Sequence, residues 1–145
     1  MPYTLRIQAD PGAAEVAWLQ QRLREFNRSR VENARHGSFL VTSISPEDKI
    51  VAGLLAKLSY GWMFVDTLWV ADNARGHGLG RRVLHAAENE ARRNACTNAW
   101  VDTFSFQAQG FYEKCGYKIF GQLPDYPLGH TRYFLSKCLM SELID

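Results

Sequence analysis

The residues with the most evident chemistry form a glycine-rich turn, Arg75-Gly76-His77-Gly78-Leu79-Gly80, which follows an apolar strand and opens a helix. Three glycines at alternate positions leave the turn with almost no side-chain cover. Several backbone N–H groups can therefore close on one anion, and the N-terminus of the following helix adds partial positive charge. The turn predicts a binding site for a ligand that carries phosphate.

Two other kinds of phosphate-binding turn fit these residues poorly. A nucleotide P-loop needs four residues between its glycines and then Lys-Ser or Lys-Thr, whereas Gly80 is followed by Arg81 and Arg82. The dinucleotide fingerprint is nearer, since Asp102 lies about twenty residues beyond Gly80, where a ribose-binding acid would stand. Its third glycine, which allows close packing of helix on strand, would fall at Arg81. The P-loop is therefore excluded and the dinucleotide site disfavoured.

The turn resembles the R/Q-x-x-G-x-G/A signature of the GCN5-related N-acetyltransferases (GNAT superfamily), and the strand before it ends in that family's Leu-x-Val pattern. Residues 108–117, Ala-Gln-Gly-Phe-Tyr-Glu-Lys-Cys-Gly-Tyr, are similar to the family's A-x-x-F-Y-E-K-x-G-F/Y segment. The two motifs stand in the correct order and spacing, and chance agreement of both is hard to accept. On these residues the chain is identified as a member of this superfamily.

The resemblance implies a single-domain α/β fold over residues 1–145, with a mixed central sheet of about six to seven strands flanked by about four helices. Local patterns predict the same order of elements. The strands are expected over residues 3–8, 38–44, 49–59, 62–70, 99–106, 117–123 and 131–139, and the helices after Asp10-Pro11, from Leu79 and over residues 107–115.

Two of these helices have apolar residues at three- and four-residue steps, so each is expected to bury one face. In the first helix these residues are Val16, Leu19, Leu23 and Phe26. In the second they are Leu79, Val83, Ala87 and Ala91, a narrow stripe typical of a helix that lies on a sheet.

The composition limits the classes of function. At 145 residues the chain has room for one domain with a real core. A net charge of +2 is too small to argue for nucleic acid by itself. No apolar run is long enough to span a bilayer, and the polar start lacks the hydrophobic region of a signal peptide. We expect a cytoplasmic protein that binds neither nucleic acid nor membrane, with a homodimer left open.

The cysteines and histidines show no pattern of a disulfide or a metal site. Cys96, Cys115 and Cys138 are odd in number and lack C-x-x-C spacing, which favours reduced core thiols. The four histidines form no ligand pattern, so no metal is expected.

The resemblance implies acetyl-CoA as the co-substrate. In this family the glycine turn binds the CoA pyrophosphate through backbone amides, and the pantetheine arm lies beside the preceding strand like an added strand. The residues that match these positions are Leu68, Trp69, Val70, Arg75, Gly76, His77, Gly78, Leu79, Gly80 and Arg81. Ordinary burial of residues 68–70 in a strand is compatible with this role, because only backbone groups are required. For Arg82 a solvated helix face is preferred.

One position departs from the family pattern. Many relatives place asparagine at the end of the strand after the helix, three residues before the alanine of the second motif. This chain has Ser105 there. A shorter side chain can still bond the pantetheine amide, so Ser105 is included among the CoA-binding candidates.

Tyr112 matches the tyrosine that in many relatives lies near the CoA sulfur and protonates the departing thiolate. The alternative is that Phe111 and Tyr112 both pack against the sheet. CoA is a thiol leaving group with a pKa of about 8.5, so it departs far more readily than an alkoxide and demands less of an acid.

Asp66 is the candidate for interacting with the substrate amine, because relatives have their catalytic base in the region of this strand. Alternation places it on one face with Phe64 and Leu68. A carboxylate near pKa 3.9 is about six units more acidic than an alkyl ammonium near 10.4, so direct deprotonation is poor. A water relay or attraction of the substrate cation is the better role. The alternative is a carboxylate paired with a neighbouring arginine or a backbone donor.

Together the residues and the resemblance imply an N-acetyltransferase that moves acetyl from acetyl-CoA to a primary amine of a small molecule or peptide. Direct attack would occur in a ternary complex, with a backbone N–H near residues 68–70 polarising the thioester carbonyl. A non-enzymatic acyl-CoA-binding regulatory domain is the alternative, which the presence of Tyr112 and Asp66 disfavours. Tyr126 and His130, in the proline-rich loop 123–130, could touch the acceptor.

Overall fold

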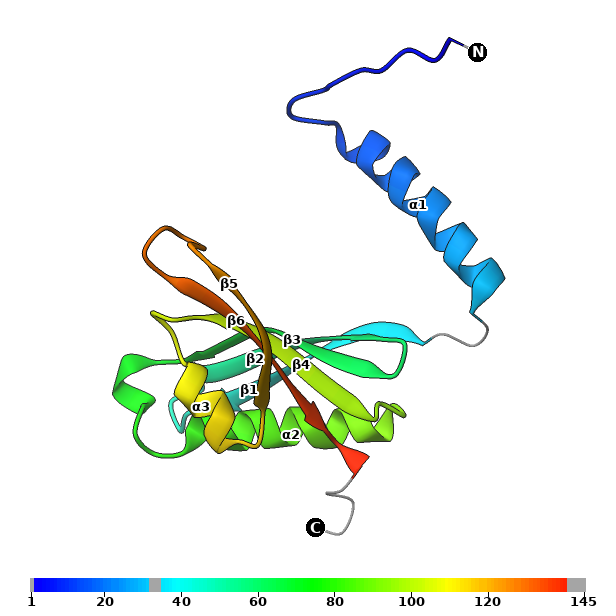
Figure 1. Ribbon diagram of the computed structural model, residues 1–145. Helices are drawn as coiled ribbons and strands as arrows, with labels where there is room; N and C mark the ends of the chain where they lie inside the picture. Colours follow the sequence, from blue (N-terminus) through cyan, green and yellow to red (C-terminus); the bar gives the residue numbers. More distant parts are fainter. Residues whose placement is uncertain (1, 32–34, 141–145) are drawn as a thin grey trace. The chain divides into compact units, whose positions relative to one another are not determined.

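Two compact units make up the chain, and they divide between residues 34 and 35. The computed structural model describes residues 2–31 of the first unit and 35–140 of the second. Figure 1 follows the chain from α1 through the strands and helices of the second unit.

The first unit contains one long helix, α1 (Ala13–Arg30). It begins after Gly12, close to the start expected after Asp10-Pro11, and it ends at Arg30. Within the first unit no residue of α1 is buried, and Leu19 and Phe26 are 65% and 56% exposed. The helix is confirmed, and the burial of one of its faces stays a prediction.

The strand predicted over residues 3–8 is wrong, since these residues form no strand. Side-chain alternation favours an extended segment, but a strand also needs a hydrogen-bonded neighbour. In the second unit the sheet consists of β1 to β6.

The second unit is a mixed six-stranded sheet with helices packed against it, as the sequence predicted. Its strand order is β1-β2-β3-β4-β6-β5, and every neighbouring pair is antiparallel except β3 and β4. The strands are β1 (His36–Ile44), β2 (Ile50–Ser59), β3 (Trp62–Val70), β4 (Asn98–Phe104), β5 (Lys118–Pro124) and β6 (Thr131–Cys138). The helices are the 3-10 turn η1 (Asp72–Ala74), α2 (Leu79–Arg93) and α3 (Gln109–Lys114). With α1, the described residues contain three α-helices, one fewer than expected.

Tight turns connect the first three strands. At the β1–β2 turn, the N–H of Asp48 donates to the carbonyl of Ser45 at 2.9 Å. At the β2–β3 turn, Tyr60 and Gly61 have φ angles of +51° and +81°. Positive φ at both central residues is typical of the turns that match the twist of a two-stranded ribbon.

The core lies between the sheet and α2, which runs along one face of β1, β2 and β3 (Figure 1). Alternate residues of β2 point into it, and Ala52, Leu54 and Ala56 are fully buried. The predicted stripe of α2 meets them, with Val83 and Ala87 buried. The amphipathic pattern of α2 is therefore confirmed.

The strands β3 and β4 separate part-way along their length. Their parallel pairing joins residues 62–65 to residues 98–101 and stops there. Beyond it, β3 continues to Val70 and β4 to Phe104. The split between these two central strands positions the candidate site.

A bulge in β3 lies at the start of this split. Leu55 of β2 pairs with Thr67, and the next residue, Ala56, pairs with Val65. Asp66 is therefore an extra residue without a partner in β2, which bends the strand locally.

The three cysteines are free, and their burial differs. Cys96 is buried as predicted, Cys115 is half-buried, and Cys138 is exposed, so the prediction of a core thiol is wrong for Cys138. Across residues 2–31 and 35–140, no helix has both the length and the apolar character that crossing a membrane requires.

Candidate functional site

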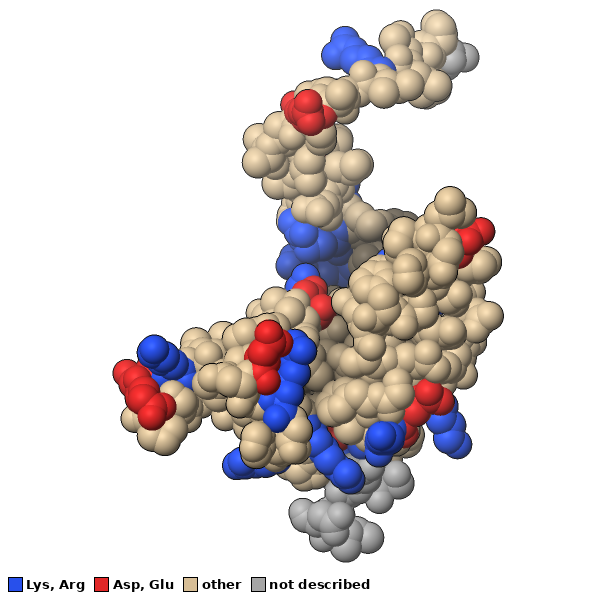
Figure 2. Space-filling model, turned by 90° about the vertical axis from the view of Figure 1, so that its left-hand side faces the viewer, with Lys and Arg blue, Asp and Glu red and all other residues tan. Residues whose placement is uncertain are grey.

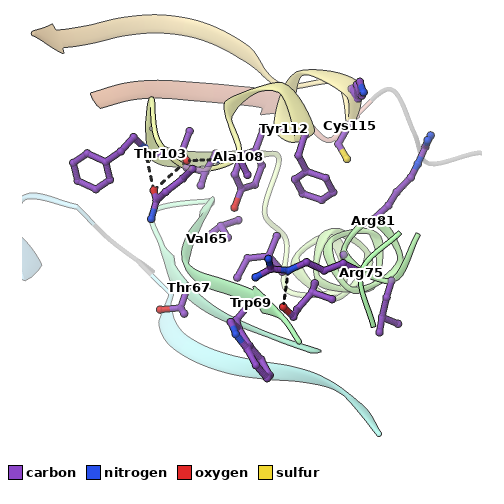
Figure 3. Close-up of a pocket in the computed structure, with 18 of the residues that line it drawn as sticks. Val65, Thr67, Trp69, Arg75, Arg81, Thr103, Ala108, Tyr112 and Cys115 are labelled. Carbon is purple, nitrogen blue, oxygen red and sulfur yellow. Dashed lines mark hydrogen bonds between the residues drawn. The ribbon is translucent and has the colours of Figure 1, made fainter. Parts of the chain in front are cut away.

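A pocket of about 900 Å³ opens where β3 and β4 separate. In Figure 3, Val65, Thr67 and Trp69 lie along its β3 side, and Ala108 and Tyr112 lie on the side of α3. The glycine turn, the start of α2 and the end of β4 also line it. The predicted phosphate-binding turn and the predicted proton donor thus face one common space.

Most of the predicted site residues line this pocket together. They are Asp66, Leu68, Trp69, Val70, Arg75, Gly76, Gly78, Leu79, Gly80, Arg81 and Tyr112. His77 and Ser105 are not among the lining residues. His77 Nδ1 lies 2.9 Å from the carbonyl oxygen of Arg75. The hydroxyl of Ser105 accepts from the N–H of Thr131 at 3.0 Å and lies 3.2 Å from His130 Nδ1. A contact of Ser105 with CoA stays a prediction, and its hydroxyl is engaged within the protein.

The glycine turn has the backbone conformation that an anion site needs. Gly76 and Gly78 have φ angles of +80° and +73°, and a Cβ added at either would meet nothing within 4 Å. Gly78 directly precedes α2, and no side chain caps that helix. The first N–H groups of a helix have no partner inside it, so these groups are available to a phosphate.

Gly80 serves close packing. A Cβ added there would lie 3.4 Å from Val70 Cγ2 and 3.5 Å from the ring of Phe111. These are contact distances, so alanine fits and a larger side chain would displace β3 or α3. The small residue lets α2, β3 and α3 meet beside the pocket.

Arg75 braces the turn. Its Nε donates to the carbonyl of Val70 at 3.1 Å, and its Nη1 lies 3.0 Å from a carboxylate oxygen of Asp72. Arg81 is exposed and lines the pocket, whereas Arg82 is exposed and does not line it. Arg81 is thus better placed than Arg82 to add positive charge for a ligand.

The outer part of β3 offers a backbone edge to the pocket. Residues 67–70 pair with residues 52–55 of β2 on one side, and on the other they have separated from β4. An extended chain that carries amides can add to such an edge as a further strand. This geometry suits the role predicted for residues 68–70.

The bulge changes the neighbours of Asp66. Leu68 pairs with Leu54, which is fully buried. Phe64 pairs with Lys57, which is exposed. Phe64 and Leu68 therefore lie on opposite faces, and the prediction that they share one face with Asp66 is wrong, because the extra residue shifts the alternation by one.

Asp66 is an ion-pair partner as well as a pocket residue. One carboxylate oxygen lies 2.9 Å from Lys57 Nζ, and the other accepts from Thr67 Oγ1 at 2.8 Å. The hydrogen bond from Lys57 is the largest of the effects that lower the pKa of Asp66 below its usual value. A lower pKa makes a weaker general base. The alternative of a paired carboxylate is thus present, with lysine in place of arginine.

Tyr112 is 6% exposed, and its ring meets those of Phe111 and Tyr117 edge-on at centroid distances of 5.2 and 5.9 Å. Burial, followed by the nearby Cys115 and Asp102, raises the pKa of Tyr112 to about 12. The phenol therefore stays protonated at neutral and mildly alkaline pH. The two predicted roles are compatible, since the ring packs against its neighbours and also lines the pocket.

Sequence reasoning missed a polar turn between β4 and α3. Gln107 Oε1 accepts from Thr103 Oγ1 at 3.2 Å and from the N–H of Phe104 at 3.0 Å, while the N–H of Ala108 donates to Thr103 Oγ1 at 3.4 Å. Figure 3 shows these bonds on the wall of the pocket. These hydrogen bonds connect the start of α3 to the end of β4, and no sequence motif predicts them.

An aromatic wall, Phe104, Phe106 and Tyr126, was also missed as a group. The rings of Phe104 and Phe106 stack at 5.1 Å with an interplanar angle of 16°, and both residues line the pocket. The Arg132 guanidinium lies 5.2 Å from the ring centre of Phe104 and 4.8 Å from that of Tyr126. Asp102 fixes that guanidinium by hydrogen bonds of 3.0 and 2.7 Å. Phe106 is 57% exposed, so it presents ring surface to a ligand.

The surface charges do not gather into a basic patch on the face of the second unit seen in Figure 2, where acidic and basic side chains lie next to one another. Arg75 pairs with Asp72, and Arg93 pairs with Glu90. Within the part of the chain that the structure describes, no group of three His, Cys, Asp or Glu residues is placed to hold a metal. These observations offer no support for a nucleic-acid interface or a metal centre.

Comparisons with known proteins agree with the fold. A family model described as the acetyltransferase (GNAT) family matches residues 4–117. The chain is 39% identical over 117 residues to the blasticidin-S acetyltransferase of Streptomyces morookaense, covering 79% of this chain and 86% of that protein. It is 28% identical over 137 residues to acetyltransferase Atu2258 of Agrobacterium fabrum, covering 94% and 98%. The crystal structure of an acetyltransferase from Bacillus cereus has a TM-score of 0.84 at 27% identity, covering 92% of this chain and 97% of that one.

Proposed function

The chain belongs to the acetyltransferase (GNAT) family, and on that premise we propose that it transfers acetyl from acetyl-CoA to a primary amine by direct attack in a ternary complex. One observation carries this mechanism. The pocket at the split of β3 and β4 joins the uncapped N-terminus of α2 to Tyr112. The alternative, a non-enzymatic acyl-CoA-binding domain, is disfavoured because the relatives it matches are named acetyltransferases.

The chain's own groups suit an acyl-CoA at this pocket. The N–H groups at the start of α2 and the bare backbone of Gly76 and Gly78 fit the pyrophosphate, with Arg81 beside them. The open edge of residues 67–70 fits the two amides of the pantetheine arm. An arm that follows this edge from the glycine turn leads toward the middle of the sheet, where Tyr112 lines the pocket.

The reaction then needs no covalent enzyme intermediate. The lone pair of the neutral amine attacks the thioester carbonyl carbon, and a backbone N–H near residues 68–70 stabilises the oxyanion. The C–S bond breaks as the carbonyl re-forms, and the electron pair leaves on sulfur. One proton of the original ammonium goes to water and another leaves the nitrogen after attack. The products are the N-acetyl amine and CoA, whose sulfur gains one proton.

Tyr112 acts in this scheme on the departing sulfur. Its pKa of about 12 lies well above the value of about 8.5 for a thiol, so complete transfer of its proton is uphill by roughly 3.5 pKa units, about 5 kcal/mol. The phenol therefore stabilises the developing thiolate chiefly as a hydrogen-bond donor, and the final proton comes from solvent.

Blasticidin S is the first acceptor to test, because a relative 39% identical to this chain is named a blasticidin-S acetyltransferase. Blasticidin S combines an amine with a planar cytosine ring. The aromatic wall, with Phe106 57% exposed, offers such a ring a stacking surface. Stacking of a base on an aromatic side chain is worth about 1–3 kcal/mol.

The test is release of free CoA thiol from acetyl-CoA with blasticidin S, a polyamine, an aminoglycoside and a peptide with a free N-terminus. We expect saturable thiol release with blasticidin S and an acetylated product by mass spectrometry. If thiol is released only with another of these amines, that amine becomes the assigned acceptor. If thiol is released with none of them, the proposed function is contradicted.

A further inference from the structure

A buried charged network lies where α2, β6 and the end of α3 meet. The side chain of Glu88 is 2% exposed and that of Lys137 is 10% exposed. Lys137 Nζ donates to Glu88 Oε1 at 3.1 Å, and the hydroxyl of Tyr117 donates to Glu88 Oε2 at 2.8 Å. The proposed reaction uses none of these three side chains.

The network is bonded directly to the end of α3. Lys137 Nζ also donates to the carbonyl oxygen of Cys115 at 2.9 Å. Cys115 is the residue that follows α3, where helix carbonyls lack partners and a positive charge is favourable. Glu88 therefore positions the ammonium of Lys137, and this ammonium binds the C-terminal end of α3.

The same end of α3 carries Tyr112. The N–H groups of Cys115 and Tyr117 both donate to the carbonyl of Tyr112 at 3.0 Å. The ring of Tyr117, whose hydroxyl is bonded to Glu88, meets the ring of Tyr112 at an interplanar angle of 72°. At 6 residues α3 is too short to be stable by itself, so tertiary contacts set its orientation.

We propose that Glu88 and Lys137 are positioning residues for Tyr112: their ion pair fixes the C-terminal end of α3 and so holds the phenol at the pocket. This inference rests on the proposed function, in which Tyr112 meets the CoA sulfur. A buried ion pair is a weak device for stability, because the cost of desolvating two charges offsets their attraction. A fixed orientation of the short helix is what the network adds.

The probe is the charge-balanced double variant Glu88→Gln, Lys137→Met, which leaves neither charge buried alone. We expect kcat to fall roughly 10- to 100-fold, the scale of a small misplacement at a reacting centre, while KM for acetyl-CoA stays nearly constant. In a Tyr112→Phe background the same double variant should cost little more, since both changes act through one hydroxyl. Additive losses in this cycle would overturn the proposal.

A second readout is independent of turnover. With 3-fluorotyrosine incorporated, the Tyr112 signal is assigned from Tyr112→Phe, and it should shift or broaden in the double variant. The matched control is Glu90→Gln, Arg93→Met, which removes an exposed ion pair of the same helix and should leave that signal unchanged. If the double variant does not fold, Tyr117→Phe replaces it, because it removes only the hydroxyl contact to Glu88.

These outcomes separate the two proposals. If the wild-type protein acetylates no amine but the Tyr112 signal is displaced in the double variant, the proposed function is overturned and the positioning role is supported. An unchanged signal together with wild-type kcat would overturn the positioning role while the acetyltransferase stands.

Discussion

At the scale of single residues, Tyr112→Phe should lower kcat more than it raises KM for acetyl-CoA. A donor to the departing sulfur acts in the transition state, whereas ground-state binding of CoA depends on the turn and the β3 edge. Because the leaving group is good and full proton transfer is uphill, we expect a loss near or below about 100-fold, the low end of general acid catalysis. Steady-state kinetics with saturating acceptor measures this. Unchanged kcat across the pH range would leave Tyr112 a packing residue.

The phenol of Tyr112 should also make the free energy of unfolding depend on pH in the alkaline range. Burial raises the pKa of Tyr112 from 10.0 in the unfolded chain to about 12, so folding favours the protonated form. Its contribution to stability is complete below pH 10 and is lost as the pH rises toward 12. Over that window the wild type should lose about 3 kcal/mol relative to Tyr112→Phe. Urea unfolding of both proteins at several pH values from 9 to 12 would show it, and parallel curves would contradict the raised pKa.

Asp66→Asn should weaken use of the acceptor while affinity for acetyl-CoA stays nearly constant. Asparagine keeps the shape but removes the charge that attracts an ammonium, and the deficit should shrink as the pH approaches the pKa of the amine. Lys57→Met is the matched control, because it breaks the same ion pair from the other side. If both variants behave alike in acceptor kinetics, Asp66 serves only as the partner of Lys57. Both side chains are partly exposed, so either change should have a small effect on stability.

At the scale of elements, the sequence predicted features that depend on neighbouring residues in the chain. It did not predict features that depend on which strands pair with one another. The stripe of α2 follows from side-chain period and the strand over residues 62–70 from a local apolar run, and the sequence contains both features in full. The bulge at Asp66 depends on which residues of β2 pair with β3, and an alternating pattern does not contain that information. The strand expected over residues 3–8 was wrong for the same kind of reason, since alternation does not supply a partner.

The glycine turn can be tested with a control that the chain itself provides. Gly78 and Gly61 both have positive φ, +73° and +81°, and both have open space where a Cβ would stand. Alanine at either position should cost a similar strain of roughly 1 kcal/mol. Only Gly78 lines the pocket, so Gly78→Ala should weaken acetyl-CoA binding by calorimetry and Gly61→Ala should not. If the two variants bind acetyl-CoA with equal affinity, this turn does not bind the phosphate.

At the scale of the molecule, the site draws on segments that are distant in sequence. Two motifs identified the glycine turn and Tyr112, because each motif is a continuous run of residues. The aromatic wall has no such run, since Arg132 joins Tyr126 to Phe104 across two strands and a loop. Ser105 stands at a position that the family pattern assigns to CoA binding, but it does not line the pocket. Its hydroxyl instead accepts a hydrogen bond from the N–H of Thr131. Contacts of this kind become visible only when the chain is folded.

The last prediction follows from linkage, because a ligand that binds only the folded state stabilises it by mass action. Acetyl-CoA at about one hundred times its Kd should add about 2.7 kcal/mol to the free energy of unfolding and raise Tm by several degrees. S-acetylpantetheine carries the thioester and the amides but no pyrophosphate, so at equal concentration it should raise Tm far less. Thermal unfolding with each compound measures the difference without any acceptor. If the two compounds raise Tm equally, the β3 edge holds the ligand and the uncapped end of α2 contributes nothing to its binding.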